Sequence, residues 1–244
     1  MRRAVGLIGY GRFGALAARY LSRLADVVVF DPRGGTLAGS RVRRGTLGEA
    51  AACPLVVLAV PISRMRRVLR AIAPLVRPGA LVADVCSVKT KPLAWMREAL
   101  PRSVAILGTH PLFGPDSDTG TLRGQRLVVC PSRGGRRALP LLRRIARAQG
   151  VEIILMTPPA HDRLMAETLL VTHYVGRLLH GAGLAARFPA TASYEHLQVV
   201  VRTALRDSEQ LFLDMWRFNP YAPRVRRALE RSARALGKRT RGED

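Results

Sequence analysis

The run Ala4-Val5-Gly6-Leu7-Ile8 leads directly into Gly9-Tyr10-Gly11-Arg12-Phe13-Gly14, and this stretch decides the fold. The apolar residues predict a buried strand, and the pattern over residues 13–24 predicts a helix directly after the glycines. In such a turn the first glycine permits the tight bend, the second lets the backbone approach a pyrophosphate, and the third permits close helix packing. We therefore expect a dinucleotide-binding turn, with its cofactor contacts at Gly9, Gly11, Arg12, Phe13 and Gly14.

A second apolar run, residues 27–30, ends at Asp31, about twenty residues beyond the glycine turn. A carboxylate at the end of this strand is well placed to accept hydrogen bonds from a ribose diol. Asp31 favours NAD, because a carboxylate would repel the 2′-phosphate of NADP. Arg12 and Arg33 lie close by in the sequence and can bind such a phosphate, so NADP stays open as the alternative cofactor.

Strand and helix patterns then alternate along the first two thirds of the chain, which is typical of a parallel sheet covered on both faces. The further expected strands are residues 55–60, 80–85, 104–107, 126–130 and 151–156. The expected helices between them are residues 63–72, 92–100 and 136–149. The pattern predicts an α/β fold with a Rossmann-type, doubly wound parallel sheet over residues 1–157.

After Thr157-Pro158-Pro159 the strand signals stop, and this sequence is also a good helix start. The periodic segments that follow are residues 161–186, 194–205, 209–217 and 224–236. They predict an all-α C-terminal domain over residues 158–244. Because the first strand begins almost at Met1 and the last helix ends near the C-terminus, we expect no additional fused domain.

Composition limits the class of protein and its compartment. The chain has 244 residues, 48% of them hydrophobic, and no apolar run approaches the roughly 20 residues needed to cross a bilayer. The apolar start breaks at Gly9, too early for a signal peptide. Three cysteines without metal-ligand spacing indicate reduced thiols. We expect a cytoplasmic protein without a metal site.

The formal net charge of +23 allows two interpretations. A basic surface can attract nucleic acid or anionic substrates, or arginine can simply replace lysine throughout. The arginines are scattered over the chain, no helix-turn-helix is recognisable, and interleaved aromatic residues for base stacking are lacking. We therefore expect no specific nucleic-acid binding. The tail over residues 224–241 is denser in basic residues, and its order stays open.

Two segments fall where strands of the sheet should end, which is where ligands bind in such folds. They are Asp84-Val85-Cys86-Ser87-Val88-Lys89 and Thr109-His110-Pro111-Leu112-Phe113-Gly114-Pro115-Asp116. Oxidation of an alcohol by hydride transfer needs a base, and histidine is the usual choice because its pKa lies near the working pH. From the residues alone, His110 is either this base or a structural histidine in a turn.

At this point the sequence resembles the prephenate/arogenate dehydrogenases of tyrosine biosynthesis. The two segments above, the glycine turn and the later Thr172-His173-Tyr174-Val175-Gly176-Arg177 carry the resemblance, as does His161-Asp162-Arg163. It extends over essentially the whole chain, and the motif around His110 is rather specific. In the helical half, Tyr194-Glu195, Asp207-Ser208 and Asn219-Pro220-Tyr221-Ala222 are similar to plant-type arogenate dehydrogenases.

The resemblance implies an oxidative decarboxylation of prephenate or arogenate, with hydride transfer to NAD(P). The products would be 4-hydroxyphenylpyruvate or tyrosine, together with carbon dioxide. His110 matches the family's catalytic histidine, which accepts the hydroxyl proton. Ser87 matches the serine that orients this histidine and the substrate.

The resemblance also implies a dicarboxylate substrate bound by residues from both halves. His173 matches the histidine that faces the substrate pocket, although a packed structural histidine is the alternative. Arg202 is the expected partner of a substrate carboxylate, and Arg206 competes for this role. Lys89 either attracts substrate or cofactor or is a solvent-exposed lysine at a helix start. For Asp116, the hypothesis is that it pairs with an arginine and so gates the pocket.

Other expectations from the resemblance concern assembly and specificity. We expect His161 to be structural, capping or pairing at the domain boundary. The C-terminal helices are expected to form a homodimer. Prephenate and arogenate stay open as substrates, and so does feedback inhibition by tyrosine. A related enzyme acting on an amino-substituted prephenate or another β-hydroxy acid is the main alternative.

Overall fold

The computed structural model describes residues 4–184 and 188–242. The chain divides into two compact units, Met1–His161 and Asp162–Asp244. The division falls inside the first helix after Pro158-Pro159, a few residues beyond the expected boundary after residue 157.

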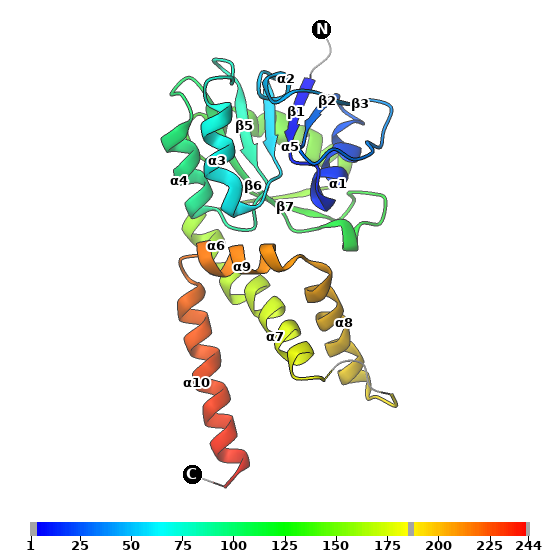
Figure 1. The fold of residues 1–244 in the computed structure, drawn as a ribbon, viewed down its shortest axis with the longest axis vertical. Helices are drawn as coiled ribbons and strands as arrows, with labels where there is room; N and C mark the ends of the chain where they lie inside the picture. The colour runs from blue at the N-terminus through cyan, green and yellow to red at the C-terminus, as the bar shows by residue number, and fades with distance from the viewer. Residues whose placement is uncertain (1–3, 185–187, 243–244) are drawn as a thin grey trace. The chain divides into compact units, whose positions relative to one another are not determined.

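The first unit is built on an eight-stranded sheet with the strand order β3-β2-β1-β4-β5-β6-β7-β8 (Figure 1). The strands are β1 (Ala4–Ile8), β2 (Asp26–Phe30), β3 (Val42–Arg44), β4 (Leu55–Leu58), β5 (Leu81–Asp84), β6 (Ala105–Pro111), β7 (Arg126–Pro131) and β8 (Glu152–Leu155). The order reverses between β1 and β4, as a doubly wound sheet requires. The predicted fold class is therefore confirmed.

The expectation of a wholly parallel sheet is wrong at one junction. The neighbouring strands from β3 to β6 pair in parallel, but β7 pairs with β6 in the antiparallel direction, and β8 runs parallel to β7. The chain enters β7 from a loop over residues 112–125 rather than through a crossover helix. An antiparallel pair needs no crossover, because its two strands can be joined at one end of the sheet.

Helices cover both faces of this sheet. They are α1 (Arg12–Leu21), α2 (Leu47–Ala51), α3 (Ile62–Ile72), α4 (Thr90–Ala99) and α5 (Leu139–Gln149). Residues of α1 and α5 pack on the face formed by Leu7, Val57 and Leu107. Gly6 and Gly108 point to the opposite face, where α2 and α4 approach them, and α3 packs beside α4. Alternating strand residues thus serve two separate hydrophobic layers.

The sequence pattern did not predict β3 or α2. Strand β3 has three residues, and its two arginines are exposed, so it has no apolar run to recognise. Helix α2 has five residues, too few for a helical period to emerge. Its start is nevertheless encoded, because Thr46 and Glu49 form a capping box.

The second unit is helical, as predicted. The helices at and beyond the division are α6 (Pro158–Glu167), α7 (Leu169–Gly181), α8 (Ala192–Arg206), α9 (Glu209–Phe218) and α10 (Ala222–Thr240). The single helix expected over residues 161–186 is wrong, because α6 and α7 are separate helices that meet at Thr168, where the backbone is distorted (φ −118°, ψ −78°). The expected end of that helix, residues 185–186, lies outside the described residues. The basic tail is ordered over its described part, because residues 222–240 form α10.

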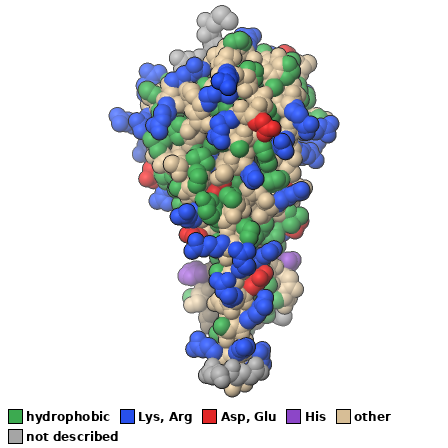
Figure 2. Space-filling view, turned by 90° about the vertical axis from the view of Figure 1, so that its left-hand side faces the viewer, with side chains coloured by type: hydrophobic (Ala, Val, Ile, Leu, Met, Phe, Trp, Pro, Cys, Tyr) green, Lys and Arg blue, Asp and Glu red, His purple; other side chains and the backbone are tan. Residues whose placement is uncertain are grey.

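The charge of the surface is dispersed. Figure 2 shows Lys and Arg side chains spread over the visible face among apolar and uncharged atoms, without a single continuous patch. Within the part of the chain that the structure describes, no helix is both long and apolar enough to span a membrane.

Candidate active site

The glycine turn between β1 and α1 has the tight backbone that a bound phosphate group requires. Gly9 has a φ of +100°, and a Cβ atom there would lie 2.2 Å from the carbonyl oxygen of Ala59. A Cβ atom on Gly14 would lie 2.3 Å from the carbonyl oxygen of Gly9. Gly11 is the N-cap of α1 and brings no side chain to the first helical turn. The backbone can therefore approach a ligand closely at a helix N-terminus, which favours binding of an anion.

Asp31 follows β2 and faces this turn. Its carboxylate accepts a hydrogen bond from the backbone N–H of Tyr10 at 2.7 Å and from the backbone N–H of Arg33 at 2.9 Å. The Arg33 guanidinium binds both carboxylate oxygens, at 3.1 and 3.0 Å. Burial would raise the pKa of Asp31, but these hydrogen bonds and the Arg33 charge outweigh it and lower the pKa to about 2. Asp31 is thus ionised and already paired.

His110 lies in β6, opposite Val128 of β7, near the carboxyl end of the strand. Its side chain is almost completely buried, with a residue exposure of 6%. Burial lowers the pKa of His110 well below 6.5, and the neighbouring His161 and Lys89 lower it further. The imidazole is therefore neutral at physiological pH, which is the protonation state that a general base needs.

His161 is the hydrogen-bond partner of His110. The Nδ1 atom of His110 and the Nε2 atom of His161 are 2.9 Å apart, and the two rings meet edge to face at 75°. Helix α6 positions His161, and the Thr157 side chain caps the start of that helix by accepting from the Ala160 N–H at 3.3 Å. The expectation of a purely structural His161 is incomplete, because its ring contacts the candidate base directly.

Lys89 holds the ends of β5 and β6 together from inside the protein. Its side chain is fully buried, forms an ion pair with Asp84, and donates to the Thr109 carbonyl oxygen at 2.6 Å. The Thr109 hydroxyl in turn donates to the Asp84 carbonyl oxygen at 2.5 Å. The idea of a solvent-exposed lysine is wrong, and the Lys89 ammonium is committed to these strand ends beside His110.

Ser87 lies in the turn after β5 and is partly exposed. Among the described residues its hydroxyl makes no hydrogen bond to His110, whose ring is instead bound by His161. The neighbouring Cys86 N–H donates to the Asp84 carboxylate at 3.0 Å and fixes the path of the turn. The Ser87 hydroxyl therefore lies near the end of β5 and is not hydrogen-bonded to His110.

The loop that follows His110 is tied to the helix of the glycine turn. Arg12, the first residue of α1, forms an ion pair with Asp116 at 2.7 Å. Asp116 lies in the short 3₁₀ helix Pro115–Ser117. The predicted pairing of Asp116 with an arginine thus has a specific partner, which is one of the expected cofactor residues.

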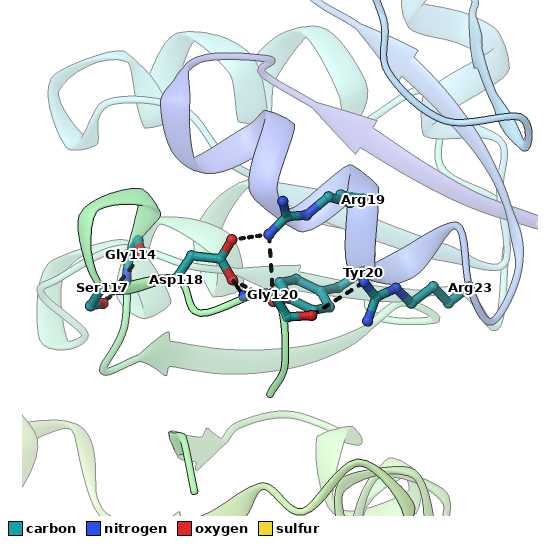
Figure 3. Close-up of polar contacts among 7 residues, drawn as sticks. All are labelled: Arg19, Tyr20, Arg23, Gly114, Ser117, Asp118 and Gly120. Atoms are coloured by element: carbon teal, nitrogen blue, oxygen red, sulfur yellow. Dashed lines mark hydrogen bonds and ion pairs between the residues drawn. The ribbon is translucent and has the colours of Figure 1, made fainter. Parts of the chain in front are cut away.

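A second set of contacts ties the same loop to the other end of α1. Figure 3 shows the Asp118 carboxylate accepting from both the Arg19 guanidinium and the Tyr20 hydroxyl. Arg23 donates to the Gly120 carbonyl oxygen at 3.4 Å. The loop after the candidate base is therefore anchored along the length of the helix that begins at the glycine turn.

In the second unit, His173 on α7 is the buried polar residue of interest. It is 2% exposed, and its Nε2 atom lies 3.4 Å from an Asp207 carboxylate oxygen. Its Nδ1 atom has no hydrogen-bond partner among the described residues. Burial lowers the pKa of His173, Asp207 opposes this shift, and Arg177 adds to it. Arg177 also donates to the Asp207 backbone carbonyl at 2.9 Å.

Arg202 and Arg206 are one helical turn apart on α8, and both are exposed. Arg206 makes an interaction within the protein. Arg202 forms no ion pair or hydrogen bond with another described residue through its guanidinium. We therefore prefer Arg202, because its guanidinium has no partner among the described residues.

Comparison with known proteins indicates a family for this chain. Residues 39–155 match the family described as "Prephenate dehydrogenase, nucleotide-binding domain". Residues 39–155 therefore belong to the prephenate dehydrogenase family. A relative from Methanocaldococcus jannaschii, named a probable arogenate/prephenate dehydrogenase, is 30% identical over 68% of this chain and 39% of its own length. The chain thus spans well under half of that longer family member.

Two further members of the prephenate dehydrogenase group match nearly the whole chain. The 4-amino-4-deoxyprephenate dehydrogenase of Streptomyces pristinaespiralis is 29% identical over 96% of this chain and 83% of that protein. The prephenate dehydrogenase of A. aeolicus, solved with hydroxyphenyl propionate and NAD+, superposes with a TM-score of 0.75 at 17% identity. That superposition covers 99% of this chain and 91% of the other, and it shows a shared fold.

The sequence signals for this family site differ in strength. His110 stands in a specific motif, but His161 is separated from it by 51 residues and sits at an ordinary helix start. Only the three-dimensional path from β6 to α6 brings the two rings together. The sole signal for His161 was the His161-Asp162 pair itself, which a single sequence cannot connect to His110.

Proposed function

We propose that this chain is an NAD(P)-dependent dehydrogenase that oxidatively decarboxylates prephenate or arogenate. The ring hydroxyl loses its proton to His110 as the hydride is transferred. The ring carboxylate then leaves as carbon dioxide, the ring becomes aromatic, and His110 returns the proton to the phenolate oxygen. When bound, the nicotinamide supplies the acceptor for the hydride. The product is 4-hydroxyphenylpyruvate from prephenate or tyrosine from arogenate.

The hydrogen bond between His110 and His161 carries this proposal, because it ties the tautomer of the base to that of its partner. Only one hydrogen atom can lie between the two nitrogens, which are 2.9 Å apart. If His110 donates it from Nδ1, its Nε2 atom has a lone pair and can accept the substrate proton. The resulting imidazolium keeps its Nδ1–H bonded to a neutral His161. Burial, which keeps His110 uncharged before the reaction, supports the same role.

The dinucleotide fits the turn at Gly9, Gly11 and Gly14. A side chain at Gly9 or Gly14 would collide with backbone atoms, so the close backbone approach is built into the sequence. Arg12 and Phe13 begin the helix at the pyrophosphate position, and Asp31 with Arg33 marks the adenosine end.

The substrate carries two carboxylates, and cationic or polar groups are needed to bind them. We assign this role to Arg202 and His173 in the second unit, and a hydroxyl-binding role to Ser87 in the first. The Nδ1 atom of His173 has no partner in the described part of the chain, and this supports its assignment, because buried polar atoms usually have a partner. Asp116 and Lys89 act indirectly, through Arg12 and through His110 respectively.

A second candidate substrate is 4-amino-4-deoxyprephenate. The relative from Streptomyces pristinaespiralis is named for it and matches this chain over 96% of its residues. An amino group in place of the ring hydroxyl would still need a proton acceptor at the position of His110.

The test is to follow reduction of NAD+ and NADP+ by absorbance with each of the three substrates. Turnover of prephenate or arogenate that is lost in His110→Gln supports the main proposal. Turnover of the amino compound alone selects the second candidate. Folded protein that binds a dinucleotide but turns over none of the three substrates refutes both.

Assembly and compartment complete the proposal. We propose a homodimer through the C-terminal helices, because α10 has 19 residues and Ala222 is the only one described as buried. Light scattering during size-exclusion chromatography tests it, and a monomeric mass at micromolar concentration refutes it.

The three free, buried cysteines support a reducing compartment such as the cytoplasm, and cell fractionation tests this.

A further inference from the structure

The acceptor positions of the Asp31 carboxylate are already filled. A carboxylate offers about four lone-pair sites, and Asp31 receives hydrogen bonds from the Tyr10 N–H, the Arg33 N–H and two nitrogens of the Arg33 guanidinium. A ribose diol can hydrogen-bond to this carboxylate only by displacing Arg33. Asp31 therefore does not offer the open acceptor that favours NAD in related folds.

Arg33 also cancels the negative charge at this position. Its guanidinium neutralises Asp31, yet the side chain is 66% exposed and so remains accessible from solvent. One of its terminal nitrogens lies 3.6 Å from the point where a Cβ atom of Gly11 would stand. The guanidinium therefore lies over the glycine turn, at the adenosine end of the expected dinucleotide site.

Arg44 adds a second cation beside the same loop. It is the last residue of β3, and its guanidinium donates to the Gly35 carbonyl oxygen in the segment after Asp31. Among the described residues no carboxylate pairs with Arg44. Arg12, the other expected phosphate ligand, is instead paired with Asp116.

We infer that the adenosine end of the site is built for a 2′-phosphate and that the chain binds NADP in preference to NAD. Arg33 is the specificity-determining residue, because it blocks Asp31 as a ribose acceptor and offers its outer N–H groups to the phosphate. Arg44 supports it with a second positive charge. This inference rests on the dinucleotide binding in the proposed function and extends it to the choice of cofactor.

The experiment measures binding rather than turnover. NADP+ and NAD+ are titrated into the full chain by calorimetry, and the fragments 2′,5′-ADP and 5′-AMP are titrated in parallel. These fragments isolate the contribution of the 2′-phosphate. The variant Arg33→Ala is compared with Arg147→Ala, which removes the same charge from an exposed position on α5.

We expect the wild-type protein to bind NADP+ more tightly than NAD+, and 2′,5′-ADP more tightly than 5′-AMP. Arg33→Ala should weaken NADP+ roughly tenfold to a hundredfold, as for loss of hydrogen bonds to a charged group. The affinity of the same variant for NAD+ should stay within about threefold of the wild-type value or increase, because Asp31 becomes open to the ribose. Arg147→Ala should change neither affinity, and Arg44→Ala should weaken NADP+ less than Arg33→Ala does.

Two results overturn the inference while leaving the proposed function intact. One is a wild-type protein that binds NAD+ at least as tightly as NADP+. The other is an Arg33→Ala variant that weakens both dinucleotides equally while its thermal unfolding is unchanged. Failure of the folded protein to bind either dinucleotide overturns the inference and the proposed dehydrogenase together. Preferential NADP+ binding without turnover of any cyclohexadienyl substrate supports the inference and refutes only the proposed reaction.

Discussion

The Nδ1 atom of His110 and the Nε2 atom of His161 lie 2.9 Å apart in a buried pair of imidazoles. Two neutral rings in this arrangement are asymmetric, because one must donate and the other must accept. The pair therefore couples the chemistry of a residue in β6 to the orientation of a residue in α6.

Replacing His161 should impair His110 as a base while leaving its imidazole in place. We expect His161→Ala to lower kcat roughly tenfold to a hundredfold, because the His110 ring then samples the wrong tautomer and orientation. His161→Gln places an amide oxygen near the position of the lost Nε2 atom and should recover part of the activity. Steady-state kinetics decides this, and equal losses in both variants would argue against a hydrogen-bonding role.

The pH profile of kcat/KM should show the low pKa of His110. Burial and the neighbouring His161 and Lys89 hold this pKa well below 6.5, so the base stays unprotonated as the pH falls through 6.5. We expect the acidic limb of the profile to lie below pH 6.5. In His161→Ala it should move upward, because the ring that lowers the pKa of His110 and helps to bury it is removed. An acidic limb at or above 6.5 in the wild type would contradict this.

Lys89 should matter for stability as well as for the base. Lys89→Met leaves the Asp84 carboxylate buried without its ammonium partner, and loss of one partner of a buried pair costs about 3–5 kcal/mol. Chemical unfolding measures this loss. The double variant Asp84→Asn/Lys89→Met removes both charges and should regain much of it. A single variant as stable as the wild type would show that the pair does not stabilise the strand ends.

Asp31 should contribute to stability in a defined pH range. Its folded pKa is about 2, against 3.8 ordinarily, so the ionised form stabilises the fold above pH 3.8. This stabilisation is lost as the pH falls from 3.8 towards 2. Because the Arg33 side chain is largely exposed, we expect Asp31→Asn to cost only about 1–2 kcal/mol at neutral pH. Denaturant titrations at several pH values should show the difference between the two proteins shrinking below 3.8.

The two arginines of α8 should differ in their effect on substrate binding. Arg202→Gln should raise the KM of a dicarboxylate substrate roughly tenfold or more with little change in the KM of the dinucleotide. Arg206→Gln, at the residue that already has an interaction within the protein, is the matched control and should have a smaller effect. The reverse order would transfer the assignment from Arg202 to Arg206.

Much of the fold follows from local patterns in the sequence. The glycine turn, the long apolar strands and most of the helices were predictable because burial imposes a period on residues 4–155 and on the helical half. Strand β3 and the antiparallel direction of β7 were not, because a three-residue strand with two exposed arginines has no period. Strand direction depends on the path of the connecting loop, which no short-range pattern encodes.

The site shows the same limit at the level of single residues. His110 and Asp31 could be selected because each follows an apolar strand in a motif with a chemical purpose. Two features could not be predicted, because they depend on side-chain geometry. They are the neutralisation of Asp31 by Arg33 and the burial of Lys89. His161 illustrates the point best, since its partner lies on a different element and 51 residues away.

The antiparallel pairing of β6 with β7 has a consequence for how this protein can diversify. Because the two strands run in opposite directions, the loop over residues 112–125 leaves and re-enters the sheet at neighbouring points. Insertions or deletions there can alter the wall of the catalytic region without shifting the strand that carries His110. The reversal thus separates a fixed chemical centre from a segment that evolution can lengthen, shorten or exchange.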